Sequence, residues 1–152
     1  MVRCFLLSVL VSCTALPRSH AADDFLDPDK AFQVSARPLG DKSLEVIFQV
    51  APGYYLYREQ FKFDATGASL GTPKLPHGKV KYDETFQKDV ETYRDVLRIA
   101  VPVERAESRF TLVVRSQGCA DAGLCYPPQQ NAFSVRLAGF SGDSSVRRLP
   151  AK

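Results

Sequence analysis

Two cysteines, Cys119 and Cys125, bound a short loop of mostly small residues, so their thiols are close enough in the chain to form a disulfide with each other. Five residues separate them, which differs from the C-x-x-C spacing of thioredoxin-like proteins. In the chain-entropy model, a disulfide that closes so short a loop contributes roughly 2 kcal/mol to stability. The same pair could instead exchange between dithiol and disulfide with a partner protein. The spacing alone leaves a structural staple and a redox pair both open.

The charge around the two thiols does not decide between these interpretations. Asp121 lies inside the loop, which contains no Lys, Arg or His, although Arg115 is close in the sequence. A neighbouring carboxylate disfavours the thiolate form of a cysteine, so we expect both thiols to be slow nucleophiles. Slow thiols suit a carrier that reacts only in a docked complex, and they suit an inert staple equally well.

The segments on both sides of the loop must position it, and both alternate apolar and polar residues. The apolar positions are Phe110, Leu112 and Val114 before the loop and Phe133, Val135 and Leu137 after it. A period of two is typical of half-buried β-strands. We therefore expect the cysteines at or near the tip of a β-hairpin.

Other short alternating runs predict further strands, and helical periodicity is almost absent. The expected strands lie around residues 32–34, 44–50, 54–57, 60–64 and 97–103. We expect a turn over 104–108, a polar loop over 79–90, and a linker or disordered tail over 139–152, where Gly, Ser and Arg are frequent. Short strands with turns at short intervals predict an all-β fold, a single antiparallel β-sandwich.

The first 21 residues have the features of a secretory signal peptide. Arg3 is followed by an apolar run over 5–11, and Ser19-His20-Ala21 resembles a small-x-small cleavage site. A loose lipoprotein box ending at Cys13 is the alternative. Cleavage would remove Cys4 and Cys13 and leave one cysteine pair in a compartment where disulfides persist. Loss of Arg3 and Arg18 would also lower the formal net charge from +3 to about +1, which gives no electrostatic case for binding nucleic acid or an anionic membrane.

Three separate motifs carry a resemblance to a known family. Residues 117–128, 53–58 and 91–95 are similar, in the same order, to the N-terminal periplasmic domain of the bacterial thiol:disulfide interchange protein DsbD. The resemblance implies an immunoglobulin-like sandwich over 22–138 and a protein-disulfide reductase, a module of a larger system. It also implies that Cys125 joins the mixed disulfide with a partner and that Cys119 resolves it.

The resemblance further implies a pocket and a cap around the cysteines. Tyr55 and Tyr57, which could simply be half-buried strand aromatics, would line the redox pocket, and strand alternation places them on one face. Phe86 would be the aromatic of a cap loop that covers the disulfide until a partner opens it. An acidic residue before Phe86 would tune the chemistry of the cysteines, and the pattern does not decide whether it is Glu84 or Asp83. The expected pocket and cap consist of Tyr55, Tyr57, Glu84, Phe86 and Asp121.

Proteins of this family receive electrons from a thioredoxin-like donor domain and deliver them to periplasmic disulfide isomerases and a cytochrome c maturation thioredoxin. In them a multi-helix membrane domain lies in the same polypeptide, so this chain is either a fragment or a stand-alone version that uses separate donors. We expect a periplasmic monomer without cofactor or metal, since His77 has no metal-ligand spacing to the cysteines. The alternative is a secreted immunoglobulin-like binding module with a purely structural disulfide.

Overall fold

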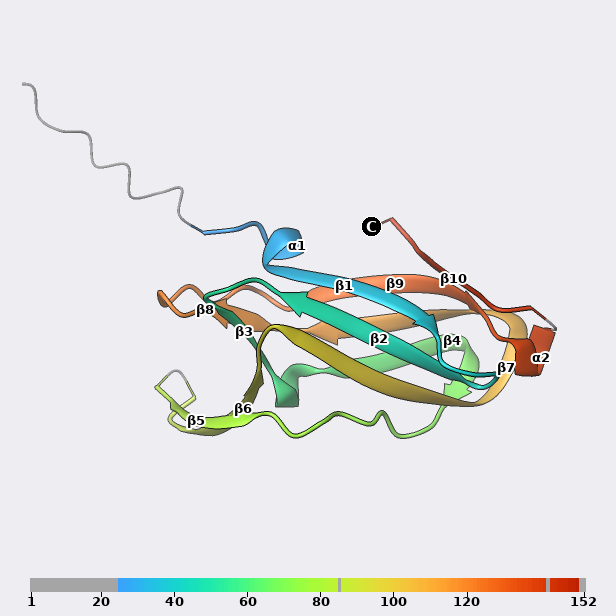
Figure 1. Cartoon of the computed structure of the whole chain (residues 1–152), viewed down its shortest axis with the longest axis horizontal. Helices are drawn as coiled ribbons and strands as arrows, with labels where there is room; N and C mark the ends of the chain where they lie inside the picture. Colours follow the sequence, from blue (N-terminus) through green and yellow to red (C-terminus); the bar gives the residue numbers. More distant parts are fainter. Residues whose placement is uncertain (1–24, 85, 142, 151–152) are drawn as a thin grey trace, which may run out of the picture.

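The computed structural model describes residues 25–84, 86–141 and 143–150, and these residues form an all-β sandwich (Figure 1). The elements are α1 (Pro28–Ala31), β1 (Phe32–Pro38), β2 (Ser43–Val50), β3 (Tyr54–Tyr57), η1 (Arg58–Gln60), β4 (Lys62–Leu70), β5 (Lys79–Asp83), β6 (Lys88–Tyr93), β7 (Val96–Ser116), β8 (Gly118–Ala120), β9 (Gln129–Arg136), α2 (Ala138–Ser141) and β10 (Ser145–Arg148). The signal peptide expected over 1–21 and the lipoprotein alternative at Cys13 lie outside the described residues. In the described ranges no helix is long and apolar enough to cross a membrane.

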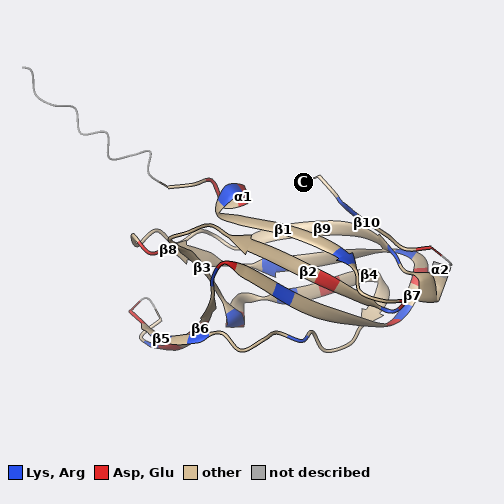
Figure 2. Ribbon diagram, in the orientation of Figure 1, with Lys and Arg blue, Asp and Glu red and all other residues tan. Residues whose placement is uncertain are grey.

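The strands form two antiparallel sheets, as the sequence predicted. The larger sheet has the order β1-β2-β7-β9-β10, with β4 also paired to β7, and the smaller has the order β5-β6-β3-β8. Alternation builds the core: Leu44, Val46 and Phe48 of β2 are fully buried and lie opposite Val101, Ile99 and Leu97 of β7. Basic and acidic residues are interspersed along the ribbon (Figure 2).

Strand β7 differs from the expectation of two strands separated by a turn over 104–108. It runs without a break for 21 residues, because β4 pairs with it across that stretch, with Ala68 opposite Ala106 and Ser69 opposite Arg105. The pairing has two register shifts, and at both of them the extra residues lie in β7. The N-terminal half of β7 pairs with β2 and the C-terminal half with β9, so one strand connects both parts of the larger sheet.

Two further segments are more ordered than the sequence suggested. The expected polar loop over 79–90 is largely the hairpin β5–β6, and Glu84, Phe86 and Gln87 lie between its two strands. The stretch 139–152, expected to be a linker or disordered tail, contains the end of α2 and the strand β10, which pairs with β9 from Ser145 to Arg148. The expectation is therefore wrong for residues 145–148, which pair with β9 while the half-buried Val146 packs against the hydrophobic core.

Candidate functional site: a disulfide at one end of the sandwich

The two cysteines form a disulfide at the end of the hairpin made by β7 and β9, where the sequence placed them. Their Cα atoms are 4.0 Å apart, and the two residues form an isolated antiparallel bridge. The loop lies at the same end of the sandwich as the β5–β6 hairpin (Figure 1). Segments far apart in the sequence therefore meet around one disulfide.

The two cysteines differ sharply in burial. Cys119 belongs to β8, which leaves the larger sheet and pairs with β3 of the smaller one, and only 1% of it is exposed. Gly118 permits the close approach of β8 to β3. A Cβ at this position would lie 2.2 Å from the carbonyl oxygen of Tyr55 and would clash with it. Cys125 follows an exposed turn over residues 121–124 and is itself exposed. A partner protein can reach Cys125, whereas the body of the domain covers Cys119.

Strand β3 brings its two predicted tyrosines to the cysteines. All four of its residues are buried: Tyr54 and Leu56 belong to the main core, while Tyr55 and Tyr57 form a separate small cluster with Val90 and Cys119. Tyr55 lies directly opposite Cys119 in the β3–β8 register. The hydroxyl of Tyr57 is 3.3 Å from the Cys119 sulfur and 3.3 Å from the Tyr55 hydroxyl.

Asp83, not Glu84, is the carboxylate connected to this cluster. Asp83 is buried, and its Oδ2 accepts a 2.8 Å hydrogen bond from the Tyr57 hydroxyl, while its Oδ1 accepts one from the backbone N–H of Phe86. Glu84 is exposed at the hairpin tip. Burial raises the pKa of Tyr57 far above its usual value, and its hydrogen bonds to Tyr55 and Asp83 act in the same direction, so this phenol stays protonated.

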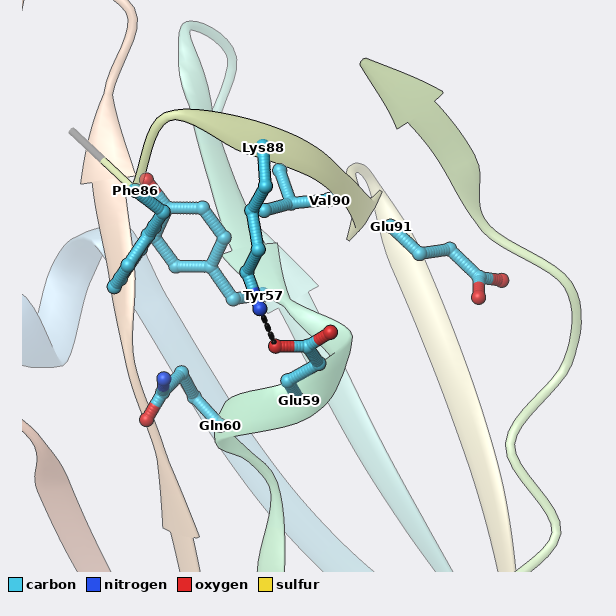
Figure 3. Close-up of a pocket in the computed structure, with 7 residues that line it drawn as sticks. All are labelled: Tyr57, Glu59, Gln60, Phe86, Lys88, Val90 and Glu91. Carbon is cyan, nitrogen blue, oxygen red and sulfur yellow. Dashed lines mark hydrogen bonds and ion pairs between the residues drawn. The ribbon is translucent and has the colours of Figure 1, made fainter. Parts of the chain in front are cut away.

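The aromatic of the cap loop lies against Tyr57 rather than burying Cys125. The rings of Phe86 and Tyr57 meet edge to face with centroids 5.2 Å apart, and Phe86 remains 40% exposed. Figure 3 shows both rings at a small cavity of about 90 Å³, beside the 2.6 Å ion pair between Lys88 and Glu59. Phe86, the expected cap aromatic, therefore contacts Tyr57, while Cys125 is exposed.

Asp121 makes a contact that the sequence did not reveal. Arg94, in the turn between β6 and β7, donates two hydrogen bonds to its carboxylate, 2.9 Å to Oδ2 and 2.6 Å to Oδ1. These bonds hold the pKa of Asp121 below its usual value. Lys81 of β5 lies 3.5 Å above the Tyr55 ring, and Arg94 lies over the same ring. The carboxylate that we expected beside the thiols is thus paired with a cation from outside the loop, Arg94.

Other predicted features lie away from this site. Arg115, close to the cysteines in sequence, pairs with Asp64 on β4. His77 is exposed in the segment before β5. Within the described part of the chain, no three His, Cys, Asp or Glu side chains gather in a way that could hold a metal ion.

Fold and site together define an all-β domain that carries an accessible disulfide at one end. Residues 22–137 match the family described as the thiol:disulfide interchange protein DsbD, N-terminal. The chain belongs to this family.

Relatives of known name and structure agree with this assignment. The chain is 49% identical over 138 residues to the thiol:disulfide interchange protein DsbD of Ralstonia nicotianae, and the aligned region covers 90% of this chain and 22% of the relative. It is 43% identical over 127 residues to DsbD of Pectobacterium atrosepticum, covering 82% of this chain and 22% of that protein. The chain thus spans about a fifth of the length of these curated relatives.

A solved relative shares the fold. The crystal structure of the Neisseria meningitidis DsbD N-terminal domain in the reduced form matches with a TM-score of 0.71 and 30% identity, covering 85% of this chain and 98% of the solved one. A structure of the complex between the DsbD and PilB N-terminal domains of the same species matches with a TM-score of 0.63 and 35% identity, covering 74% and 88%. The expected immunoglobulin-like sandwich is confirmed at the level of the whole domain.

Proposed function

We propose that this domain, over residues 22–138, is a periplasmic protein-disulfide reductase module that carries two electrons as the Cys119/Cys125 dithiol. One observation carries the proposal: of two bonded cysteines, one is 1% exposed and the other is exposed. Thiol–disulfide exchange needs one sulfur that a partner can reach and a second that waits beside it. The donor would be a thioredoxin-like domain, and the acceptors would be oxidised disulfide isomerases and a cytochrome c maturation thioredoxin.

In the proposed reaction Cys125 acts first. Its thiolate attacks one sulfur of the partner's disulfide, which forms a mixed disulfide and releases the partner's other sulfur as a thiolate. The Cys119 thiolate then attacks the Cys125 sulfur, forms the bond seen here, and releases the partner's second thiolate. Two electrons pass to the partner, and the two protons lost by the domain's thiols balance the two thiols that the partner gains.

The surroundings of Cys119 suit this second step. The neutral Tyr57 hydroxyl lies 3.3 Å from the sulfur, and its hydrogen bond to Asp83 fixes its orientation. The Tyr55–Tyr57–Val90 cluster keeps water from the sulfur, so access is limited to the partner bound at Cys125. Phe86 extends this cover on the Tyr57 side. These residues are the proposed pocket and cap.

A purely structural disulfide is the rival interpretation, and the packing argues against it. Neither cysteine belongs to the main hydrophobic core, to which β1, β2, β3, β6, β7, β8 and β9 all contribute residues. The bond joins residues only six apart in sequence, so it constrains little of the chain. The Neisseria domain, solved in its reduced form, keeps the same fold.

The test is transfer of electrons to an oxidised periplasmic disulfide isomerase, followed by the mass of alkylated thiols. We expect the reduced domain to reduce the isomerase stoichiometrically while its far-UV circular dichroism stays unchanged. In Cys119→Ser the mixed disulfide should accumulate through Cys125, and the matched Cys125→Ser variant should trap far less. Failure of the wild-type domain to reduce the isomerase, or unfolding of the domain on reduction, would leave the structural disulfide as the better explanation.

A further inference from the structure

Arg94 and Asp121 form a contact between the body of the domain and the loop that carries Cys125. Asp121 lies between the two cysteines, whereas Arg94 belongs to the β6–β7 turn, and both side chains are partly exposed, at 38% and 48%. The two-pronged guanidinium–carboxylate geometry fixes direction as well as distance. Arg94 also donates a 3.2 Å hydrogen bond to the carbonyl oxygen of Tyr54 on β3, so it is itself anchored to the sheet beneath the site.

Apart from this ion pair, backbone hydrogen bonds hold the loop, and buried Tyr126 anchors its far end by donating from its N–H to the carbonyl oxygen of Gly118 and from its hydroxyl to that of Leu26. Ala120 and Leu124 are joined by a 2.7 Å backbone hydrogen bond, and the backbone N–H of Asp121 donates to the carbonyl oxygen of Gly53. Residues 121–125 are all exposed, and the chain becomes buried again at Tyr126. While the disulfide is closed it helps to hold this turn. Once a partner takes the Cys125 sulfur, that restraint is gone and the remaining contacts must hold the turn.

We propose that Arg94 is a positioning residue, which holds the open cysteine loop through Asp121 so that Cys119 meets the Cys125 sulfur of a mixed disulfide. The inference rests on the proposed function, because it concerns the second step of that reaction. Its physical basis is effective concentration: an intramolecular attack is fast only while the reacting atoms stay in line and close. An exposed ion pair adds little to global stability, so its effect should be seen in this step rather than in the unfolding free energy.

A charge effect on the thiols is the competing explanation, and the two variants of the pair separate it from positioning. Arg94→Ala removes a positive charge near the cysteines, and Asp121→Asn removes a negative one. If charge alone acts, the two substitutions must change thiol reactivity in opposite directions. If positioning acts, both must slow the closing of the disulfide, and the double variant must be no slower than either single one.

The experiment is the reaction of the reduced 152-residue chain with 5,5′-dithiobis(2-nitrobenzoate), in a Cys4→Ser/Cys13→Ser background so that only Cys119 and Cys125 react. Release of the first thionitrobenzoate reports attack by Cys125. Release of the second is the intramolecular step, in which the Cys119 thiolate bonds to the Cys125 sulfur and the thionitrobenzoate attached there leaves. We expect Arg94→Ala and Asp121→Asn each to slow the second release about fivefold, the effect of one exposed ion pair, and to leave the first within twofold.

Arg115→Ala is the control for the loss of an exposed arginine, because Arg115 lies 3.7 Å from Asp64, its ion-pair partner on β4, and not on the loop. It should leave both releases unchanged. Opposite effects of Arg94→Ala and Asp121→Asn on the second release, additive slowing in the double variant, or no change in either would overturn the inference. Each of these results can occur while the wild-type domain still reduces the isomerase, so they are distinct from a failure of the proposed function.

Discussion

Opening the disulfide should lower the stability of this domain only modestly. The bond links residues separated by six positions and so closes a seven-residue loop. The chain-entropy model gives about 2 kcal/mol for a loop of this length. A domain of this size is stable by roughly 5–15 kcal/mol, and its main core contains neither cysteine. The reduced domain should therefore remain folded.

Urea unfolding of the same protein, oxidised and then reduced with dithiothreitol, measures this difference without a substitution in the core. Far-UV circular dichroism is a suitable probe, because the chain has no tryptophan. With a slope of roughly 1–2 kcal/mol per molar urea, the midpoint should fall by about 1–2 M and the slope should stay nearly constant. Alkylation of a sample before each scan verifies that Cys119 and Cys125 are bonded in the oxidised protein and free in the reduced one.

The reasoning fails if the reduced protein no longer unfolds cooperatively, or if its unfolding free energy falls by more than about 5 kcal/mol, beyond the usual range for a single disulfide. Either result would mean that the bond holds the fold together. The domain would then be unable to pass through its dithiol form as an electron carrier must.

Two further perturbations test the surroundings of the cysteines. Tyr57→Phe removes the hydroxyl that donates to buried Asp83, so we expect the free energy of unfolding in urea to fall by about 1–2 kcal/mol. Tyr82→Phe, at a 63% exposed position, is the control and should change this free energy little. Equal stabilities of Tyr57→Phe and the wild type would contradict the hydrogen bond between Tyr57 and Asp83. Burial, reinforced by Tyr54 and by the charge of Asp27, raises the pKa of Tyr126 to about 12, against about 10 in an unfolded chain. The contribution of the protonated Tyr126 to stability is therefore complete below pH 10 and is lost as the pH rises towards 12. The Tyr126→Phe variant should lose stability less steeply than the wild type over that interval. Parallel curves of unfolding free energy against pH for the two proteins would show that this phenol does not titrate as described.

Periodicity predicted those parts of the fold in which one face of a strand is buried. Strand β2 alternates strictly between core and surface, and so do both halves of β7, so their strand character can be read from the sequence. The same reasoning placed Tyr55 and Tyr57 on one face, and the structure brings both to Cys119. The hairpin position of the cysteines followed from the two strands that flank them.

Periodicity did not predict the strands that lack a buried face. Residues 104–109 of β7 are mostly exposed, so no apolar pattern distinguished them from a turn, and pairing with β4 decides their conformation. In β5, Val80 and Tyr82 are 63% exposed, and this edge strand was read as a loop. Pairing partners of this kind depend on distant parts of the chain, which a local pattern does not contain.

The misread edge strand also explains what was missed at the site. If residues 79–83 are recognised as a strand, alternation places Lys81 and Asp83 on the same face. On that face Lys81 contacts the ring of Tyr55, and Asp83 accepts the hydrogen bond from Tyr57. A loop gives no such rule, so the sequence could not choose between Asp83 and Glu84. Arg94 was part of a recognised motif, but its partner lies 27 residues further along the chain.

The difference between the two sulfurs follows from the way the chain leaves one sheet for the other. After Ser116 the chain departs from the β7–β9 ladder, and β8 pairs for only three residues with β3 before the turn begins. Pairing fixes Cys119 against a buried strand, whereas Cys125 lies beyond the turn, where its neighbours 121–124 are exposed. The short crossing is therefore the structural feature that leaves Cys125 exposed and buries Cys119.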